Sequence, residues 1–253
     1  MSVARDTSLI FRRQVRQDTR NPVWLLIGLS QPILYLAFFG PMLSRVLRAD
    51  EGRTGSAWQV YVPGLLVQLA LFGAAFVGFT VIADWRTGSM ERMRVTPVSR
   101  FALLMGRVLH DVAVLLAQSV VLILAAVVFG LRAPLAGIAL SLLFVALLTC
   151  SLSSLSYGLG LAVKRETAFS PMLNIATVLL LLLSGILLPM SLAPSWLNDV
   201  SRLTPLRYLV DAIRDAFVGR FATATVAEGL AVGLGLAALS LAAGTYVFCR
   251  ENV

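Results

Sequence analysis

The sequence predicts an all-α membrane protein that forms one domain, residues 1–253, with six transmembrane helices. Charged residues make up only 13% of the chain, whereas soluble domains carry about 25%. Hydrophobic residues make up 58% of the chain. The charged residues are too few to cover a surface that faces water. Six stretches each hold the roughly 20 apolar residues that a helix needs to cross a bilayer. They are residues 23–43, 58–83, 101–130, 135–162, 171–190 and 225–249.

A basic segment, residues 1–22, precedes the first predicted span. Within residues 4–20, apolar side chains such as Leu9 and Phe11 share helical spacing with arginines such as Arg12. That pattern favours an interfacial helix, which lies on the membrane surface with its apolar face inward. The alternative is that these arginines only mark the inner side of the first span.

The distribution of basic residues predicts the orientation in the membrane. If the N-terminus is inside, the inner segments hold 13 Lys and Arg and the outer segments hold 8. Positive charge is enriched on the cytoplasmic side, so both termini and residues 84–100 are expected in the cytoplasm. The same rule explains the net charge of +8, and no nucleic-acid partner is needed to account for it.

Residues 84–100, DWRTGSMERMRVTPVSR, form the longest polar interruption between apolar stretches. Pro97 ends any helix there, because proline lacks the backbone donor and restricts the residue before it. Met90 and Met93 are three positions apart and share one face of a helix. A short amphipathic helix with two adaptable methionines is suited to dock into a groove of a partner protein. A solvated charged loop is the alternative.

The outer segment, residues 191–224, is too polar to span and too apolar for a plain loop. Thr204 and Pro205 are typical of a helix start, and Leu206, Leu209 and Ile213 follow at helical spacing. We therefore expect two short helices that re-enter the outer leaflet. The residues that we assign to these two outer helices are Trp196, Pro205, Tyr208, Asp211 and Arg214.

Four polar side chains inside the predicted spans are candidates for a substrate path. Polar groups at this depth usually face protein or water, because contact with lipid is costly. Asp111 is one helical turn after Arg107, so an ion pair between them is expected, with a proton relay through the adjacent His110 as the alternative. The glutamines could equally form hydrogen bonds between helices. The four candidates are Gln31, Gln68, Asp111 and Gln118.

Catalytic and metal-binding patterns are missing from the sequence. The only lysine, Lys164, follows Val163, so no phosphate-binding G-x-x-x-x-G-K-[ST] loop is present. Cys150 and Cys249 lie far apart, and His110 is the single histidine, which predicts no metal site. We therefore expect that the chain is not an enzyme and that it binds no cofactor. Uphill transport would need ATP hydrolysis by another subunit, or an ion gradient.

The order of several motifs resembles the permease subunits of ABC-2 type transporters, similar to the daunorubicin-resistance exporter permeases of actinobacteria. The resemblance covers essentially the whole chain, with Ser89 and Met93 as mild departures from the family pattern. The matching motifs are Arg86 with Thr87–Arg92, Thr96–Arg100, Ser184-Gly185 through Leu188-Pro189, and Thr204-Pro205-Leu206 through Asp211, Arg214 and Gly219.

The resemblance implies a type V exporter-like fold and two membrane subunits, identical or different, each paired with a cytoplasmic ATPase that holds ATP and Mg²⁺. It makes residues 4–20 a connecting helix, Thr87–Val95 the coupling helix, and Ser195–Gly219 the outer re-entrant helices. The residues that would dock on the ATPase are Arg86, Thr87, Gly88, Ser89, Met90, Glu91, Arg92, Met93, Thr96 and Pro97.

The function that this resemblance implies is ATP-driven export of a hydrophobic small molecule, drug-like or lipid-like, from the cytoplasm or inner leaflet across a bacterial plasma membrane. Few charges inside the spans favour an amphiphile over an ion. A polysaccharide or glycolipid exporter of the same architecture is one alternative. An ion-coupled carrier, with His110 and Asp111 as its relay, is another.

Overall fold

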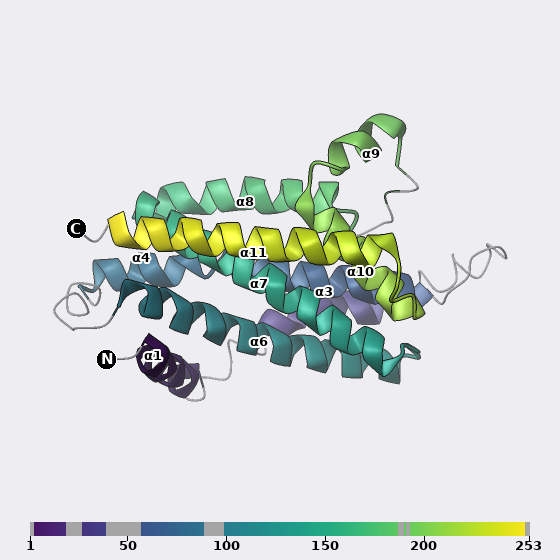
Figure 1. Cartoon of the computed structure of the whole chain (residues 1–253), viewed down its shortest axis with the longest axis horizontal. Helices are drawn as coiled ribbons and strands as arrows, with labels where there is room; N and C mark the ends of the chain where they lie inside the picture. The colour runs from purple at the N-terminus through teal and green to yellow at the C-terminus, as the bar shows by residue number, and fades with distance from the viewer. Residues whose placement is uncertain are drawn as a thin grey trace.

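The computed structural model describes residues 3–18, 27–38, 57–88, 99–186, 190 and 193–250, and its regular elements there are all helical. The long helices lie side by side in one elongated bundle (Figure 1). The helices are α1 (Val3–Asp18), α3 (Ala57–Ala75), α4 (Gly78–Arg86), α6 (Arg100–Val128), α7 (Leu135–Val163), α8 (Glu166–Leu183), α9 (Ser195–Ser201), α10 (Pro205–Val218) and α11 (Ala224–Arg250). A further apolar helix covers Ile27–Phe38.

Five helical stretches among the described residues are long and apolar enough to cross a membrane: Trp58–Arg86, which joins α3 and α4, and then α6, α7, α8 and α11. They correspond to the second to sixth predicted spans. The first predicted span, 23–43, is described only as the shorter helix Ile27–Phe38, so the sixth crossing stays a prediction. The fold is that of an all-helical multi-pass membrane protein.

The two ends of the bundle differ in the segments they carry. One, which we call the α1 end, holds α1, the last turn of α4, the start of α6, the α7–α8 corner and the end of α11 (Figure 1). The other, the α10 end, holds α9 and α10 (Figure 1). The described parts of the predicted cytoplasmic segments therefore share one end, and the described outer segments share the other.

The main core lies toward the α10 end and is built around α7. The apolar face of α10 is fully buried there, with Leu209, Ile213 and Phe217 each 0% exposed. Small residues let neighbouring backbones approach α7 closely. A Cβ atom on Gly137 would lie 2.1 Å from the carbonyl oxygen of Ala216, so this contact requires glycine.

Arg214 fastens α10 to two other elements. Its guanidinium donates to the backbone carbonyls of Gly185 at 2.8 Å and Val60 at 3.3 Å, and lies 3.4 Å from Asp211. Burial raises the pKa of the Asp211 carboxyl, and the adjacent cations Arg214 and Arg207 offset part of that rise. The polar face of α10 is thus held against the ends of α3 and α8.

The predicted span 58–83 is broken into α3 and α4 at Phe76 and Val77. The hydroxyl of Ser156 on α7 accepts a hydrogen bond from the Gly78 backbone N–H at 2.9 Å and donates one to the Ala75 carbonyl. A side chain from another helix therefore replaces backbone bonds that the break removes.

Helix α1 lies against the beginning of α6 (Figure 1). A Cβ atom on Gly106 of α6 would come within 2.7 Å of Ile10, so the two helices touch at close range. Asp6 is buried in this contact, whereas Arg12 and Arg16 are exposed. The face of α1 that meets the bundle is therefore mixed: Ile10 and Phe11 contact α6, whereas Leu9 is 56% exposed.

Candidate functional site

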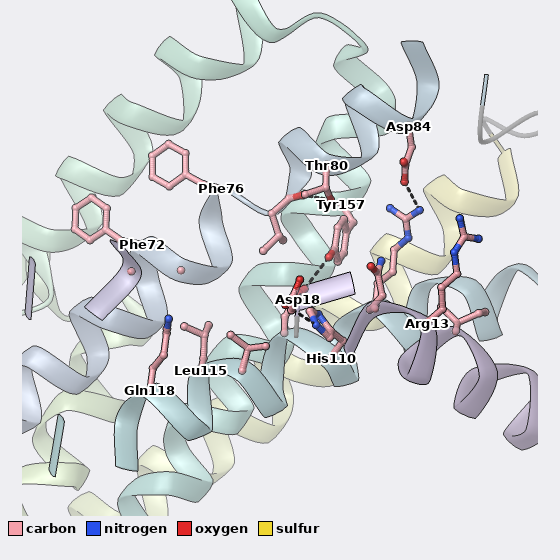
Figure 2. Close-up of a pocket in the computed structure, with 18 of the residues that line it drawn as sticks. Arg13, Asp18, Phe72, Phe76, Thr80, Asp84, His110, Leu115, Gln118 and Tyr157 are labelled. Carbon is pink, nitrogen blue, oxygen red and sulfur yellow. Dashed lines mark hydrogen bonds and ion pairs between the residues drawn. The ribbon is translucent and has the colours of Figure 1, made fainter. Parts of the chain in front are cut away.

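A cavity of about 500 Å³ opens at the α1 end, between α1, α3, α4, α6, α7 and the helix that begins at Ile27. Its wall is divided by chemistry, as Figure 2 shows. The rings of Phe72 and Phe76 lie on one side together with Leu115 and Gln118, and the charged side chains gather on the other. Those charged side chains are Arg13, Asp18, Asp84, Arg107, His110 and Asp111.

Arg107 and Asp84 form an ion pair at the charged side of the cavity. Arg107 is 5% exposed, and a charge so deeply buried needs a partner to be tolerated. This pairing corrects the expectation that Arg107 pairs with Asp111. The two residues are one turn apart on α6, but α4 places the Asp84 carboxylate nearer to the guanidinium.

Asp111 is held by other groups. The hydroxyl of Tyr157 on α7 donates to its carboxylate at 2.8 Å. His110 lies 3.4 Å from the same carboxylate through Nδ1, and its Nε2 lies 2.9 Å from Asp18 at the end of α1. Two carboxylates from different helices therefore share one imidazole, and they join α1 to α6 and α7.

A second cavity of about 290 Å³ continues from the first. It shares the walls formed by Gly28, Phe72 and Phe76 and is lined by amides in place of charges. All four polar residues singled out in the predicted spans line these two cavities. Gln31 and Gln68 line the second cavity, Asp111 lines the first, and Gln118 lines both.

Gln68 is 4% exposed, and its Oε1 atom has no hydrogen-bond partner among the described residues. A buried acceptor without a donor costs free energy in the empty cavity. Gly28 gives space to the neighbouring amide, because a Cβ atom there would lie 2.8 Å from Nε2 of Gln118. Amide groups therefore face space that a bound molecule could occupy.

The residues predicted to dock on an ATPase are described only in part. Arg86 is the last residue of α4, and Thr87 and Gly88 follow it, with Gly88 at a positive φ of 65°. These three lie at the α1 end. Ser89, Met90, Glu91, Arg92, Met93, Thr96 and Pro97 lie outside the described residues.

The residues predicted for the outer helices lie on α9 and α10. Trp196 is 67% exposed on α9, and Pro205 is the first residue of α10. Tyr208 donates to the Arg202 carbonyl at 3.1 Å, which ties α10 back to α9. None of these residues reaches the cavities, which lie on other elements.

Several contacts at the α1 end were not predicted. Lys164 lies 4.6 Å from the ring centre of Trp85, and Glu166 lies 3.1 Å from Arg86. The only sequence signal was that both loops are charged and belong to the same predicted side. Among the described residues no cluster of His, Cys, Asp or Glu is arranged to hold a metal ion.

Comparison with known proteins finds a matching family and several similar permeases. Residues 5–218 match the ABC-2 type transporter family. The chain is 27% identical to the transport permease ycf38 of Cyanophora paradoxa over 208 residues, 81% of this chain and 72% of that protein. It is 24% identical to the daunorubicin resistance ABC transporter permease protein DrrB1 of Streptomyces coeruleorubidus, over 86% and 77% of the two chains. The multidrug ABC transporter permease YbhR of Escherichia coli K12 is 22% identical over 62% and 43%.

Proposed function

Since the chain belongs to the ABC-2 type transporter family, we propose that it is the permease subunit of an ATP-driven exporter that moves a hydrophobic small molecule, drug-like or lipid-like. The observation that carries this proposal is the pair of adjoining cavities, whose walls combine stacked phenylalanine rings with charged and amide groups. Pockets for small amphiphiles have this mixed character: apolar walls bury the body and a few polar groups orient it.

The path that we propose for the substrate begins at the charged side of the first cavity and continues to the amides of the second. Phe72 and Phe76 lie between them, with ring centres 6.4 Å apart and nearly parallel planes. An amphiphile would place its polar group near Asp111 and its apolar body against these rings. Gln68 and Gln118 would then offer hydrogen bonds farther along.

The energy for transport would come from a separate ATPase that holds ATP and Mg²⁺. Residues 87–95 lead on directly from α4, so a helix docked on the ATPase would be joined to the bundle through α4. In this proposal the α1 end faces the cytoplasm of a bacterial cell, α1 lies at the membrane surface, and α9 and α10 re-enter the outer leaflet.

Helices α8 and α11 expose apolar faces that lipid and a second permease subunit could cover. Ile175 and Leu182 on α8 are 71% and 57% exposed, and Leu239 on α11 is 73% exposed. Contiguous exposed apolar surface marks an interaction with a membrane or a protein. We propose that these faces meet bilayer lipid and a second permease, identical or different.

The test is copurification from native membranes in mild detergent, followed by an ATPase assay with daunorubicin as the probe. A stoichiometric Walker-A protein, with ATPase activity that daunorubicin stimulates, is the expected result. Gln68→Leu together with Gln118→Leu should reduce that stimulation, whereas Leu124→Ile, at a position of α6 that is 61% exposed, should leave it unchanged. A chain that purifies without any ATPase would overturn the proposal.

An ion-coupled carrier is the second candidate, and one observation favours it. His110 lies between Asp18 and Asp111, an arrangement that could pass a proton along the cavity wall. Asp111→Asn separates the two functions. A carrier would need no ATPase and would lose all transport. An ATP-driven exporter would keep ATP-dependent transport at a reduced rate, because Asp111 would lie beside the substrate but would not have to transfer a proton.

A further inference from the structure

The short helix α4 is joined to the beginning of α8 by a cluster of its own. We call it the α4–α8 cluster, and it is separate from the main core. The rings of Phe79 and Phe169 pack edge to face, with a centroid distance of 4.9 Å. Its members are Phe79, Ile82, Val163, Phe169 and Leu173.

Two polar contacts lie beside this cluster, next to the segment that leads to residues 89–98. Arg86 pairs with Glu166 at 3.1 Å, and Lys164 lies over the ring of Trp85 at 4.6 Å. Helix α4 thus meets the first turns of α8 through apolar packing and an ion pair, and it meets the α7–α8 corner through a cation–π contact. Lys164 adopts a left-handed backbone, with φ of 55°, which turns the chain sharply from α7 into α8.

Helix α8 is the least enclosed of the five long apolar stretches. Only 17% of its most apolar window is buried, compared with 67% for Trp58–Arg86. Its buried residues form one narrow stripe of Phe169, Leu173 and Thr177. Within this chain, few contacts therefore oppose a displacement of α8.

From these observations we propose that α4 and the first turns of α8 move as one body, which carries displacement of the ATPase-docking segment into α8. Phe169 and Glu166 are the positioning residues on α8, and Arg86 is their counterpart on α4. This inference rests on the proposed function, because it needs an ATPase that displaces residues 87–95. It adds the α7–α8 corner to the machinery of coupling.

The first experiment is a charge exchange in proteoliposomes that hold the permease with its copurified ATPase. Daunorubicin transported per ATP hydrolysed is the measurement. Arg86→Glu and Glu166→Arg should each lower this ratio about two- to fivefold, the range that an exposed ion pair supports. The double variant should return to within about twofold of the unaltered protein, because the pair is restored in reverse. A double variant no better than the single variants would overturn the inference.

The second experiment tests the apolar contact with a matched control. Phe169→Ala should lower the transport ratio more than the charge variants do, and Phe169→Leu should retain most of it. Leu124→Ala removes an apolar side chain from α6 at a site that is 61% exposed and outside the α4–α8 cluster, and it should change nothing. Equal ratios for Phe169→Ala and Leu124→Ala would overturn the inference.

The third experiment asks whether the two elements move together. With Cys150 and Cys249 replaced by alanine, Arg86→Cys and Glu166→Cys are joined by a short bismaleimide. Transport should survive this link, and its loss would show that α4 and α8 move apart. Failure of the proposed function has a different outcome: the unaltered complex would then show no ATP-dependent transport at all, which would overturn the inference as well.

Discussion

The two ends of the bundle are built by opposite means. At the α10 end, Leu209, Ile213 and Phe217 are fully buried, and Arg214 is bonded to backbone carbonyls that belong to the scaffold. At the α1 end, buried charges pair across helices around a cavity. Close apolar packing specifies one arrangement, whereas side chains that line a cavity lack packed neighbours on one side and have space to move. If the proposed function holds, the α10 end is the fixed end and the α1 end is where the ligand and the ATPase act.

The largest loss of stability is expected from a substitution in the packed core of the α10 end. Phe217→Ala should destabilise the protein by about 3–5 kcal/mol, because it removes a fully buried ring and leaves a cavity. Thermal unfolding in detergent, followed by tryptophan fluorescence, measures the change. Phe221→Ala is the control, since that ring is 41% exposed just beyond α10. Similar losses for both would remove the distinction between the core and the surface of this end.

The next effect concerns Arg214. Arg214→Ala leaves the carbonyls of Gly185 and Val60 without their donor and should cost about 2–3 kcal/mol of stability. The same thermal unfolding assay applies, with Arg220→Ala as the control at an exposed position. If Arg214→Ala is as stable as Arg220→Ala, the hydrogen bonds of Arg214 do not hold the α10 end together.

At the α1 end the expected loss is smaller. Tyr157→Phe removes the hydroxyl that donates to Asp111 and should cost about 1.5 kcal/mol, the usual value for a hydrogen bond to a charged group. Tyr246→Phe on α11 is the matched control, since that residue is 63% exposed. A loss as large as that of Phe217→Ala would mean that the polar end is as rigid as the apolar one.

The smallest effect on stability is expected at Gln68. Gln68→Leu removes a buried acceptor that has no partner among the described residues, so the variant should be at least as stable as the unaltered protein, with a gain of up to about 1 kcal/mol. Stimulation of the ATPase by daunorubicin should nevertheless fall. A variant that loses stability and keeps full stimulation would place Gln68 in the scaffold and not in the substrate path.

The sequence predicted the elements better than their contacts. The length of the apolar stretches located five of the crossing helices, and Thr204-Pro205 with the spacing of Leu206, Leu209 and Ile213 located α10. These are local signals, because one helix alone determines them. The start of α8 at Glu166 was missed, since the apolar window begins later than the helix does.

Contacts between helices could not be predicted in this way. Asp84 and Arg107 are 23 positions apart, and their pairing depends on how α4 is turned against α6. The break between α3 and α4 depends on Ser156, which is 78 positions from Gly78. The four intramembrane polar residues were found by their cost in lipid, but only packing shows that they line adjoining cavities.

The length of α8 makes the protein sensitive to the thickness of its bilayer. Its 18 residues span about 27 Å, somewhat less than the hydrocarbon core of about 30 Å, whereas the 29 residues of α7 span about 43 Å. A long helix adapts to a thin membrane by tilting, but tilting cannot lengthen a short one. Lipids with longer acyl chains must therefore thin around α8 or draw its polar ends inward. An increase in acyl-chain length should therefore disturb α8 at a smaller bilayer thickness than it disturbs the longer helices.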